Sequence, residues 1–371
     1  MLFGYHAIMV LRWNRLAVDR STEPLVPWDE VETFVELDLP PGNVTIAPDG
    51  RIFFDLHPFA QPTRFTDAVL FELVDGEPVP YPSLEFQSEF RGPLGLHVDR
   101  HDRLWVIEPK GLEPHNTRLL GFDLVTGERC FELEFTPKQS RFSQDLRVSP
   151  DGSTMYLADT GIFTFVKPQL IVLDLETKQM RTALRRHDSV QPQRIATQTA
   201  SGRHALLWGA VSFRVGVDGI ALSADGEWLY YAAINHDGLF RVRRADLDDP
   251  TLTEADLGAR VERVGDKVLN DGIDIGDDDV LYLTDVEHGG IARMTLDGVV
   301  TTLVRSPDVV WADGVVIGPD RQVIFTDSAI PAYVDQLGCP PKRAAIDAAG
   351  PFRIYRFACG RRECQSGAVK R

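Results

Sequence analysis

Apolar and polar residues alternate along residues 217–236. Ile220 and Leu222 recur with a period of two, and so do Trp228 and Tyr230 further on. A period of two is typical of β-strands with one buried face. The pattern therefore predicts two strands within this segment.

The two strands are separated by Asp225 and Gly226. Glycine supplies the positive φ angle that a tight hairpin turn requires, so the segment predicts a β-hairpin. Because a hairpin folds back on itself, the start of its first strand and the end of its second lie at the same end. Asp218, just before the first strand, and Asn235, just after the second, should therefore be neighbours. That end of the hairpin can carry a site.

The hairpin pattern occurs five more times in the chain. The further copies are residues 44–58, 96–109, 146–161, 273–288 and 315–328. The turn residues used as markers are Asp49, Asp102, Asp151, Asp225, Asp278 and Asp320, at intervals of 53, 49, 74, 53 and 42 residues. A repeat near this length with about four strands indicates a β-propeller. We therefore predict a six-bladed β-propeller of four-stranded antiparallel blades.

We expect a propeller at residues 33–358, between an irregular lead-in at 1–32 and a C-terminal tail at 359–371. A closed ring must not leave a bare sheet edge. Thr33 to Leu39 is the candidate strand that closes the last blade, beside Phe352 to Phe357.

Two segments interrupt the repeat. Residues 185–215 include Trp208 and should lie over the face where Asp218 sits, either as a functional cover or as a solvated excursion. Residues 330–350 form the second, with a short helix predicted at 342–349.

Composition narrows the partners. The chain has 371 residues, 43% of them hydrophobic and 25% charged, and a net charge of −16. This charge argues against nucleic acid, which needs clustered Lys and Arg, and suits a metal ion or a cationic ligand better. Residues 1–12 are apolar but too short to span a membrane, and they show no secretory signal. We expect a monomer with a small-molecule ligand.

The four cysteines are Cys130, Cys339, Cys359 and Cys364. They have no Cys-x-x-Cys spacing, so zinc and redox motifs are disfavoured. Cys359 and Cys364 can pair in an exported protein and are otherwise free thiols.

Aligning the hairpins on their turns places one column of residues just before the inner strands, which line the channel. The column is Gly42, Leu94, Gln144, Asp218, Asp271 and Asp313. Carboxylates that share such a mouth repel one another unless a cation lies between them. Asp218, Asp271 and Asn270 are the candidate metal ligands, and oxygen donors of this kind suit Ca²⁺ or Mg²⁺. The alternative is that Asp-Gly here is a turn unit whose carboxylate accepts backbone N–H bonds.

A second column lies at the ends of the second strands and opens onto the same face. It comprises His57, Glu108, Asp159, Asn235, Asp285 and Asp327. From the two columns and the long insert we predict five ligand-binding residues: Gln144, Asp159, Asn235, Asp313 and Trp208.

Residues 284–290 contain Asp285, Glu287 and His288 together with two glycines. An imidazole near its ordinary pKa can give and take a proton at neutral pH, so these three are the candidate catalytic residues. His57 and His236 are weaker candidates. The chain contains no Gly-x-Ser-x-Gly, His-Glu-x-x-His, Walker or Gly-x-Gly-x-x-Gly motif, which disfavours serine hydrolases, zinc proteases and nucleotide-binding proteins.

Residues 213–223, continuing through 228–231, resemble the yellow/major royal jelly protein family, particularly its bacterial members related to dopachrome tautomerase. Residues 143–146, 156–161 and 284–288 fit as well, so the resemblance covers roughly residues 40–357. The senescence-marker/gluconolactonase family is similar and is the main rival.

The first resemblance implies a secreted six-bladed propeller that binds small molecules such as aromatic amines, with tautomerisation of a quinone-type pigment precursor in some members. The second implies a divalent ion held by a Glu, an Asn and Asp residues, and lactone hydrolysis. By register, Asp218 matches that family's Asn position and Asp271 its Asp. The early glutamate has no match, since the first blade offers Gly42 and Asn43.

Overall fold

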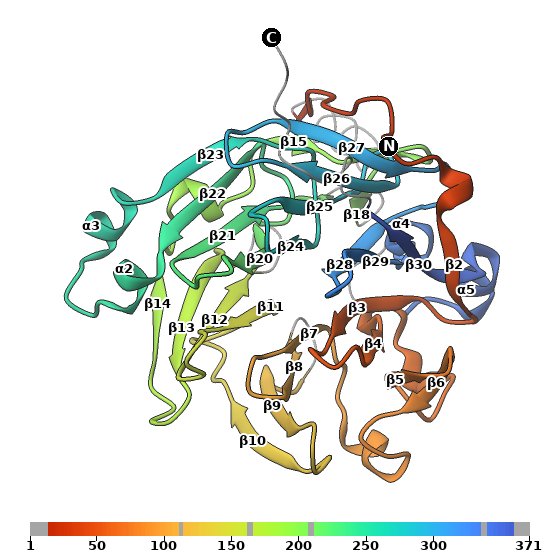
Figure 1. Cartoon of the computed structure of the whole chain (residues 1–371), viewed down its shortest axis with the longest axis horizontal. Coiled ribbons are helices and arrows are strands. Elements are labelled where there is room, and N and C mark those ends of the chain that lie inside the picture. The colour runs from red at the N-terminus through yellow and green to blue at the C-terminus, as the bar shows by residue number, and fades with distance from the viewer. Residues whose placement is uncertain (1–13, 111–113, 162–165, 207–210, 335–339, 360–371) are drawn as a thin grey trace, which may run out of the picture.

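The computed structural model describes residues 14–110, 114–161, 166–206, 211–334 and 340–359. Six four-stranded antiparallel sheets surround a central axis, and the chain visits them in order around the ring (Figure 1). In every sheet the first strand of the repeat lies innermost, and each inner strand contacts the next around the axis. The predicted six-bladed propeller is confirmed.

The strands of the first three blades follow the hairpin register expected from the alternating pattern. Blade one holds β3 (Pro41–Ile46), β4 (Ile52–Leu56), β5 (Leu70–Val74) and β6 (Glu77–Pro80). Blade two holds β7 (Gly95–Val98), β8 (Arg103–Glu108), β9 (Arg118–Asp123) and β10 (Arg129–Glu134). Blade three holds β11 (Ser143–Val148), β12 (Thr154–Asp159), β13 (Gln169–Asp174) and β14 (Met180–Ala183).

The other three blades complete the ring. Blade four holds β20 (Val217–Leu222), β21 (Trp228–Ala233), β22 (Gly238–Arg243) and β23 (Glu262–Asp266). Blade five holds β24 (Ile273–Ile275), β25 (Leu281–Asp285), β26 (Gly290–Met294) and β27 (Val300–Arg305). Blade six holds β28 (Ala312–Ile317), β29 (Gln322–Asp327), β30 (Phe352–Ala358) and β2 (Glu32–Leu37).

The ring closes as the sequence predicts. β2, near the start of the chain, pairs antiparallel with β30 near its end, with Thr33 opposite Tyr355. This pairing covers a sheet edge that would otherwise expose unpaired backbone groups. The last blade is therefore built from both ends of the chain.

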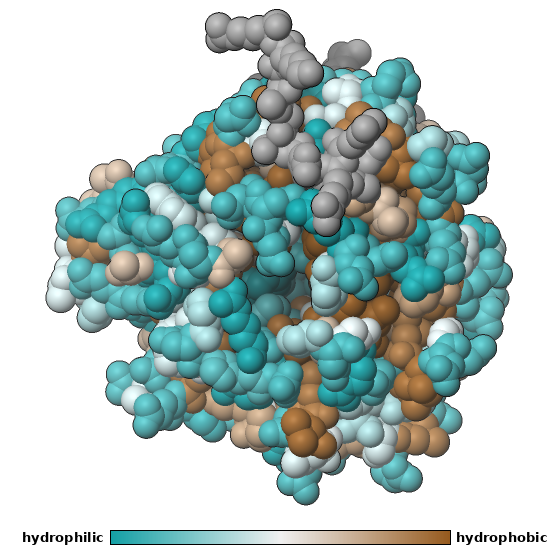
Figure 2. All heavy atoms as spheres, viewed as in Figure 1, coloured by the Kyte–Doolittle hydropathy of each residue, from teal (hydrophilic) through white to brown (hydrophobic). Residues whose placement is uncertain are grey.

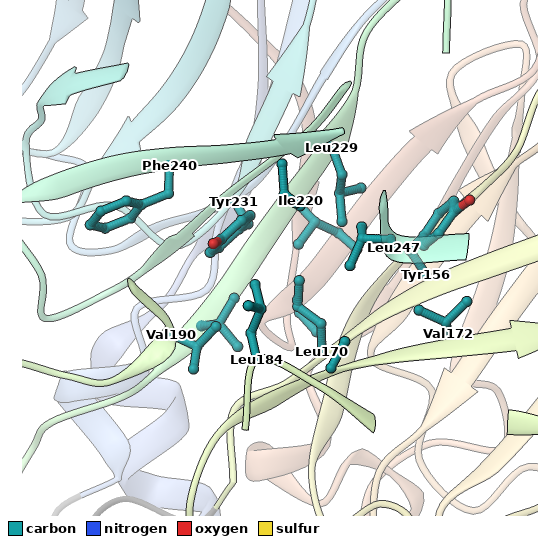
Figure 3. Packing of buried hydrophobic residues seen from close by; sticks show 14 of the residues in the cluster. Tyr156, Leu170, Val172, Leu184, Val190, Ile220, Leu229, Tyr231, Phe240 and Leu247 are labelled. Atoms are coloured by element: carbon teal, nitrogen blue, oxygen red, sulfur yellow. The ribbon is translucent and has the colours of Figure 1, made fainter. Parts of the chain in front are cut away.

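The core lies mainly between neighbouring blades. Figure 3 shows the contact between blades three and four, where Tyr156 and Leu170 from one sheet face Ile220 and Tyr231 from the other. These residues occupy alternate positions of their strands, so the period-two pattern selects the faces that pack.

Short elements fill the connections. In the ranges given above, the helices are α2 (Arg244–Asp248), α3 (Glu254–Gly258), α4 (Ile330–Tyr333) and α5 (Arg343–Ala349), with 3-10 turns at Trp28–Glu30, Pro58–Ala60, Pro62–Arg64, Glu85–Glu89 and Asp188–Val190. The predicted helix at 342–349 corresponds to α5. Within the described ranges, no helix is long and apolar enough to cross a membrane.

The described parts of the 185–215 insert, 185–206 and 211–215, carry five two-residue strands. They are β15 (Ile195–Ala196), β16 (Gln198–Thr199), β17 (Gly202–Arg203), β18 (Ala205–Leu206) and β19 (Val211–Ser212). β15 pairs parallel with β1 (Arg15–Leu16) of the lead-in. Trp208 lies outside the described residues, as do Cys339 and Cys364. Cys130 is an exposed free thiol, and Cys359 is disulfide-bonded.

Candidate functional site

Three carboxylates from three blades meet at the channel axis. The side-chain amide of Gln144 on β11 donates to Asp218 Oδ1 on β20, and it lies 3.4 Å from Asp271 Oδ1, just before β24. The charges of Asp271 and Asp313 both act on Asp218. The predicted convergence of the mouth column is thus confirmed for Gln144 and the three acids. Figure 2 shows the molecule hollowed at the centre of the ring, with mostly hydrophilic residues around the opening.

A local irregularity turns these side chains toward the axis. Four of the inner strands shift register where they begin: between Pro41 and Val44, Ser143 and Asp145, Val217 and Ile220, and Ala312 and Val315. Each shift encloses the mouth-column residue of its strand. A β-bulge changes the direction in which a side chain points. We infer that the bulges in these four strands direct the mouth-column side chains toward the axis.

The glycines after the acids allow the blades to approach. A Cβ on Gly219 would lie 2.6 Å from the backbone oxygen of Asp271, and a Cβ on Gly272 would lie 2.5 Å from that of Asp313. Gly272 N donates to Asp313 O at 3.0 Å, joining blades five and six. Asp-Gly is therefore a blade-contact unit here. The alternative of a turn unit is wrong for these acids, because within the described residues no backbone N–H donates to their carboxylates.

Burial controls the charge of the cluster. It raises the pKa of Asp218 well above its usual range, and the nearby carboxylates of Asp271 and Asp313 raise it further. Burial raises the pKa of Asp271 to about 7, opposed by a 2.7 Å hydrogen bond from the Trp311 indole N–H to Asp271 Oδ2. Burial and then Asp271 raise the pKa of Asp313. The mouth therefore holds protons that ordinary aspartates would have lost at neutral pH.

Several buried oxygens at the mouth have no hydrogen-bond donor. Asp218 Oδ2, Asp313 Oδ2 and Asn270 Oδ1 are all buried without a partner in the described part of the chain. An unsatisfied buried polar group costs about 1–3 kcal/mol. The cluster thus has an excess of acceptors, which suits a ligand that brings N–H or O–H groups or a cation.

The fit to a metal is incomplete. Among the described residues, no group of three or more His, Cys, Asp and Glu side chains could hold a metal ion. A set completed by the amide oxygen of Asn270 stays a prediction. The side-chain amide nitrogen of Asn270 donates to the backbone carbonyls of Asp271 and Gly272 at 3.1 and 3.3 Å. The amide oxygen has no hydrogen-bond partner in the described chain.

His57 borders the cluster. Its Nε2 lies 3.7 Å from Asp313 Oδ2, and its Nδ1 accepts from Phe59 N at 3.1 Å. Burial lowers the pKa of His57 to about 3, so the ring is neutral and the Nδ1 contact places its proton on Nε2, facing Asp313. His236, by contrast, is packed in blade four, where its Nδ1 accepts from Gly238 N.

The predicted catalytic residues form a separate group between β25 and β26. His288 Nδ1 contacts Asp285 Oδ2 at 2.9 Å, which is the main cause of its raised pKa. Glu287 accepts from Gln198 N of the insert at 2.9 Å, and burial raises its pKa to about 7. The three residues lie together as predicted. Within the described residues no hydrogen bond connects them to the carboxylates at the mouth.

Two predicted ligand-binding residues are fully engaged inside the protein. Asp159 accepts the backbone N–H groups of Arg141, Phe142 and Gly161. Asn235 accepts from Val215 N at 2.8 Å and donates to Ile195 O and Thr197 Oγ1 of the insert. Both hold loops in place. Their roles toward a ligand stay predictions.

Two residues at the site were not predicted from the sequence. Trp311 is fully buried and its indole N–H positions Asp271. In the sequence, the one feature that points to Trp311 is its place two residues before Asp313. Lys267 is buried, with Nζ 3.1 Å from Val268 O, and burial lowers its pKa to about 7. After burial, the charges that act on Lys267 are those of Asp237, Glu287, Asp285 and Asp218, so both the His288 group and the mouth act on it.

A cavity of about 150 Å³ lies beside this region. It is lined by Arg203, His204, Ala205, Phe213, Ile330, Pro331 and Val334. The rings of Phe213 and His204 pack edge-on against Trp311, at centroid distances of 5.6 and 6.3 Å. Trp311 therefore separates the cavity from Asp271.

Comparisons with known proteins agree on the fold. A family model described as major royal jelly protein matches residues 92–302. Among solved structures, a gluconolactonase from Xanthomonas campestris is 12% identical, with a TM-score of 0.55 and 88% of each chain covered. A luciferin-regenerating enzyme is also 12% identical, with a TM-score of 0.55 over 88% of this chain and 94% of its own. No curated protein sequence matches.

Proposed function

This chain belongs to the major royal jelly protein family, and from that premise we propose that it binds a small molecule with amine or hydroxyl donors at the channel mouth and isomerises it by moving a proton. The observation that carries the proposal is the set of buried, unpaired acceptor oxygens on Asp218 and Asp313. A ligand ammonium or hydroxyl group would satisfy these atoms and offset the repulsion between the carboxylates.

The same residues suit a proton transfer within the ligand. A carboxylate takes a proton from a carbon or oxygen of the ligand, and a neighbouring carboxylic acid returns one to a second atom. The net number of protons and electrons is unchanged, so the reaction is a tautomerisation and needs no redox partner. Carboxyl groups that lie together with unequal pKa values can divide the acid and base roles in this way.

Thermal unfolding with and without tyramine tests the binding step, with 4-ethylphenol as a matched compound that lacks the amine. We expect tyramine to raise the melting temperature and 4-ethylphenol to raise it much less. In Asp218→Asn and Asp313→Asn the response should be lost. Asp320→Asn, at an exposed turn position, is the control and should respond like the unchanged protein.

Conversion of dopachrome, followed by absorbance, tests the proton transfer. We expect Asp271→Asn to lower the rate at least tenfold and His288→Gln to leave most of it. The reverse outcome would move the chemistry to the group formed by His288, Asp285 and Glu287. If dopachrome is not converted but tyramine still binds, the proposed isomerisation is wrong and only the binding function stands.

A second candidate is a divalent-metal-dependent lactonase. The unpaired oxygens of Asp218 and Asn270 favour it, because oxygen donors of this kind suit Ca²⁺ or Mg²⁺. Such an ion would polarise the lactone carbonyl. A rise in melting temperature with Ca²⁺ or Mg²⁺, reversed by EDTA and absent in Asn270→Ala, would favour this function over amine binding.

A further inference from the structure

One side of the mouth holds a group of buried polar atoms, of which the proposed function uses only the oxygen of Asp313. Four atoms of this group make no hydrogen bond within the described chain: Asp55 Oδ2, Asp313 Oδ2, Ser328 Oγ and Tyr333 Oη. Each of the four residues is at most 6% exposed. A buried polar atom without a partner costs about 1–3 kcal/mol, so a group of them points to a bound partner.

These residues lie around Asp313. Its Oδ2 is 3.7 Å from Nε2 of His57. The hydroxyl of Ser328 and the charge of Asp55 both act on Asp313, and the charge of Asp313 acts on Tyr333. The group therefore brings together side chains from blade one, from the end of β29 and from α4.

The contact between blades six and one fixes Asp55 within the group. Thr326 Oγ1 of β29 donates to the backbone oxygen of Gly42 at 2.6 Å. The backbone N–H of Asn43 then donates to Asp55 Oδ1 at 3.0 Å, and a Cβ on Gly42 would clash with that same oxygen. The backbone thus orients the carboxyl group of Asp55 through one oxygen and leaves the other unpaired.

The group contains hydrogen-bond donors as well as acceptors. Burial, and then the charges of Asp313 and Asp327, raise the pKa of Tyr333 well above its usual range, so its hydroxyl keeps its proton. Ser328 supplies a second hydroxyl, and the neutral ring of His57 carries its proton on Nε2. The acids of the group supply acceptor oxygens.

The unpaired atoms on the side of blades four and five differ in kind. They are Asp218 Oδ2 and Asn270 Oδ1. An amide oxygen accepts only, and so does an ionised carboxylate. That side suits the ammonium of an amine, whereas the side of Tyr333 suits a group that donates and accepts at once. A hydroxyl is the smallest organic group that does both.

We propose that the group around Asp313 is a hydroxyl subsite, which binds a hydroxyl at the end of the ligand opposite its ammonium. This inference rests on the proposed function and names its substrate class as an amine that also carries a hydroxyl. The ligand hydroxyl donates to Asp313 Oδ2 and accepts from Tyr333 Oη. Both atoms then gain a partner that they lack within the described chain.

Calorimetric titration of the full-length protein with two amines tests the proposal. Tyramine carries both groups, and phenethylamine lacks only the hydroxyl. We expect tyramine to bind at least tenfold more tightly than phenethylamine. In Tyr333→Phe, which removes a single hydroxyl, tyramine should bind about tenfold more weakly, and the affinity for phenethylamine should be unchanged.

Tyr282→Phe is the matched control. This tyrosine is buried in β25, and the charges that act on it include that of Asp278 at the turn end of blade five. Both amines should bind this variant as they bind the unchanged protein. Because Tyr333 Oη has no partner within the described chain, Tyr333→Phe should keep its melting temperature. A lower melting temperature with unchanged tyramine affinity would assign that hydroxyl a structural role and overturn the proposal.

The hydroxyl subsite and the proposed function fail in different ways. Equal binding of the two amines by the unchanged protein would overturn the subsite and leave the amine site in place. If neither amine binds, 4-ethylphenol separates the two ideas. Binding of this phenol that is lost in Tyr333→Phe would keep the subsite and reject the amine site, and no binding of any of the three compounds would reject both.

Discussion

Two rings of polar residues occupy the same face of this propeller, and they differ in what their atoms bind. At the ends of the second strands, Glu108, Asp159 and Asp327 accept backbone N–H groups of the loop that leads into the inner strand of their own blade. At the mouth, Asp218 Oδ2 and Asp313 Oδ2 are buried and accept no hydrogen bond within the described chain. Residues of the same type and similar burial therefore do different work.

The difference in hydrogen-bond partners indicates which buried acids are candidates for ligand binding. Burial raises the pKa of Asp159 and Asp327 as it does that of Asp271. A raised pKa alone does not separate the two rings. The hydrogen-bond partners separate the two rings. The oxygens of an acid that holds a loop accept hydrogen bonds from that loop, whereas an acid at a ligand site has an oxygen that accepts none.

The largest effect is expected from removing a loop clamp. Asp159→Ala leaves the N–H groups of Arg141, Phe142 and Gly161 without their acceptor. We expect a loss of about 3–5 kcal/mol in the free energy of unfolding, measured by urea denaturation. Asp320→Ala, at an exposed turn, should cost less than about 1 kcal/mol. Equal losses would remove the distinction between clamps and surface acids.

The pH dependence of stability comes next. The pKa of Asp271 is about 7 in the folded protein and near 3.8 when unfolded, so between these values the folded state holds a proton that the unfolded state has released. Stability should therefore fall as pH rises from 4 to 7. We expect a contribution of roughly 2 kcal/mol, less than an isolated group would give at ~1.36 kcal/mol per pKa unit, because the three mouth acids titrate together.

Asp271→Asn removes that proton-linked difference. Urea denaturation at a series of pH values should give a flatter profile in this variant than in the unchanged protein. A profile of unchanged slope would mean that the mouth acids titrate normally.

Removing the charge of a mouth acid should affect the melting temperature in the opposite direction to removing a loop-holding acid such as Asp159. Asp218→Asn is expected to keep or raise the melting temperature at pH 8, because it removes a buried carboxylate that neighbouring acids repel. Tyramine affinity should fall at least tenfold, which is about 1.4 kcal/mol. A destabilised variant with normal tyramine binding would show that Asp218 has a structural role like that of Glu108, Asp159 and Asp327.

The smallest effect is expected at Trp311. Trp311→Phe keeps an aromatic ring but removes the N–H that donates to Asp271 Oδ2. Loss of a bond to the charged form should raise the pKa of Asp271 by about one unit. The pH midpoint of tyramine binding should move up accordingly, at a stability cost of about 1 kcal/mol. Phe213→Leu, which touches the same indole ring, is the control and should leave the midpoint in place.

Much of the fold follows from local signals in the sequence. The period of two and the Asp-containing turns predict six hairpins, and the closing strand at Thr33 pairs where it was expected. The fourth strand of blade four, β23, was not predicted, because α2 and α3 separate it from β22 and its burial pattern shows no alternation. Connections between strands depend on packing that a local pattern does not record.

The site was predictable in position but not in detail. Alignment on the turns brought Gln144, Asp218, Asp271 and Asp313 together, because equivalent positions of a closed ring face one axis. It also selected Asp159 and Asn235, whose atoms the structure uses to hold loops. It missed Trp311 and Lys267, since neither stands at a repeated position.

By itself, the sequence determined the strand faces, the turns and the number of blades, because side-chain alternation and turn chemistry act between residues close along the chain. The tertiary structure alone decided which acids are left with unpaired oxygens and which close a loop. The reason is that the donors that matter for the mouth come from other blades, as Gln144 and Trp311 do, 74 and 40 residues away from the acids they contact.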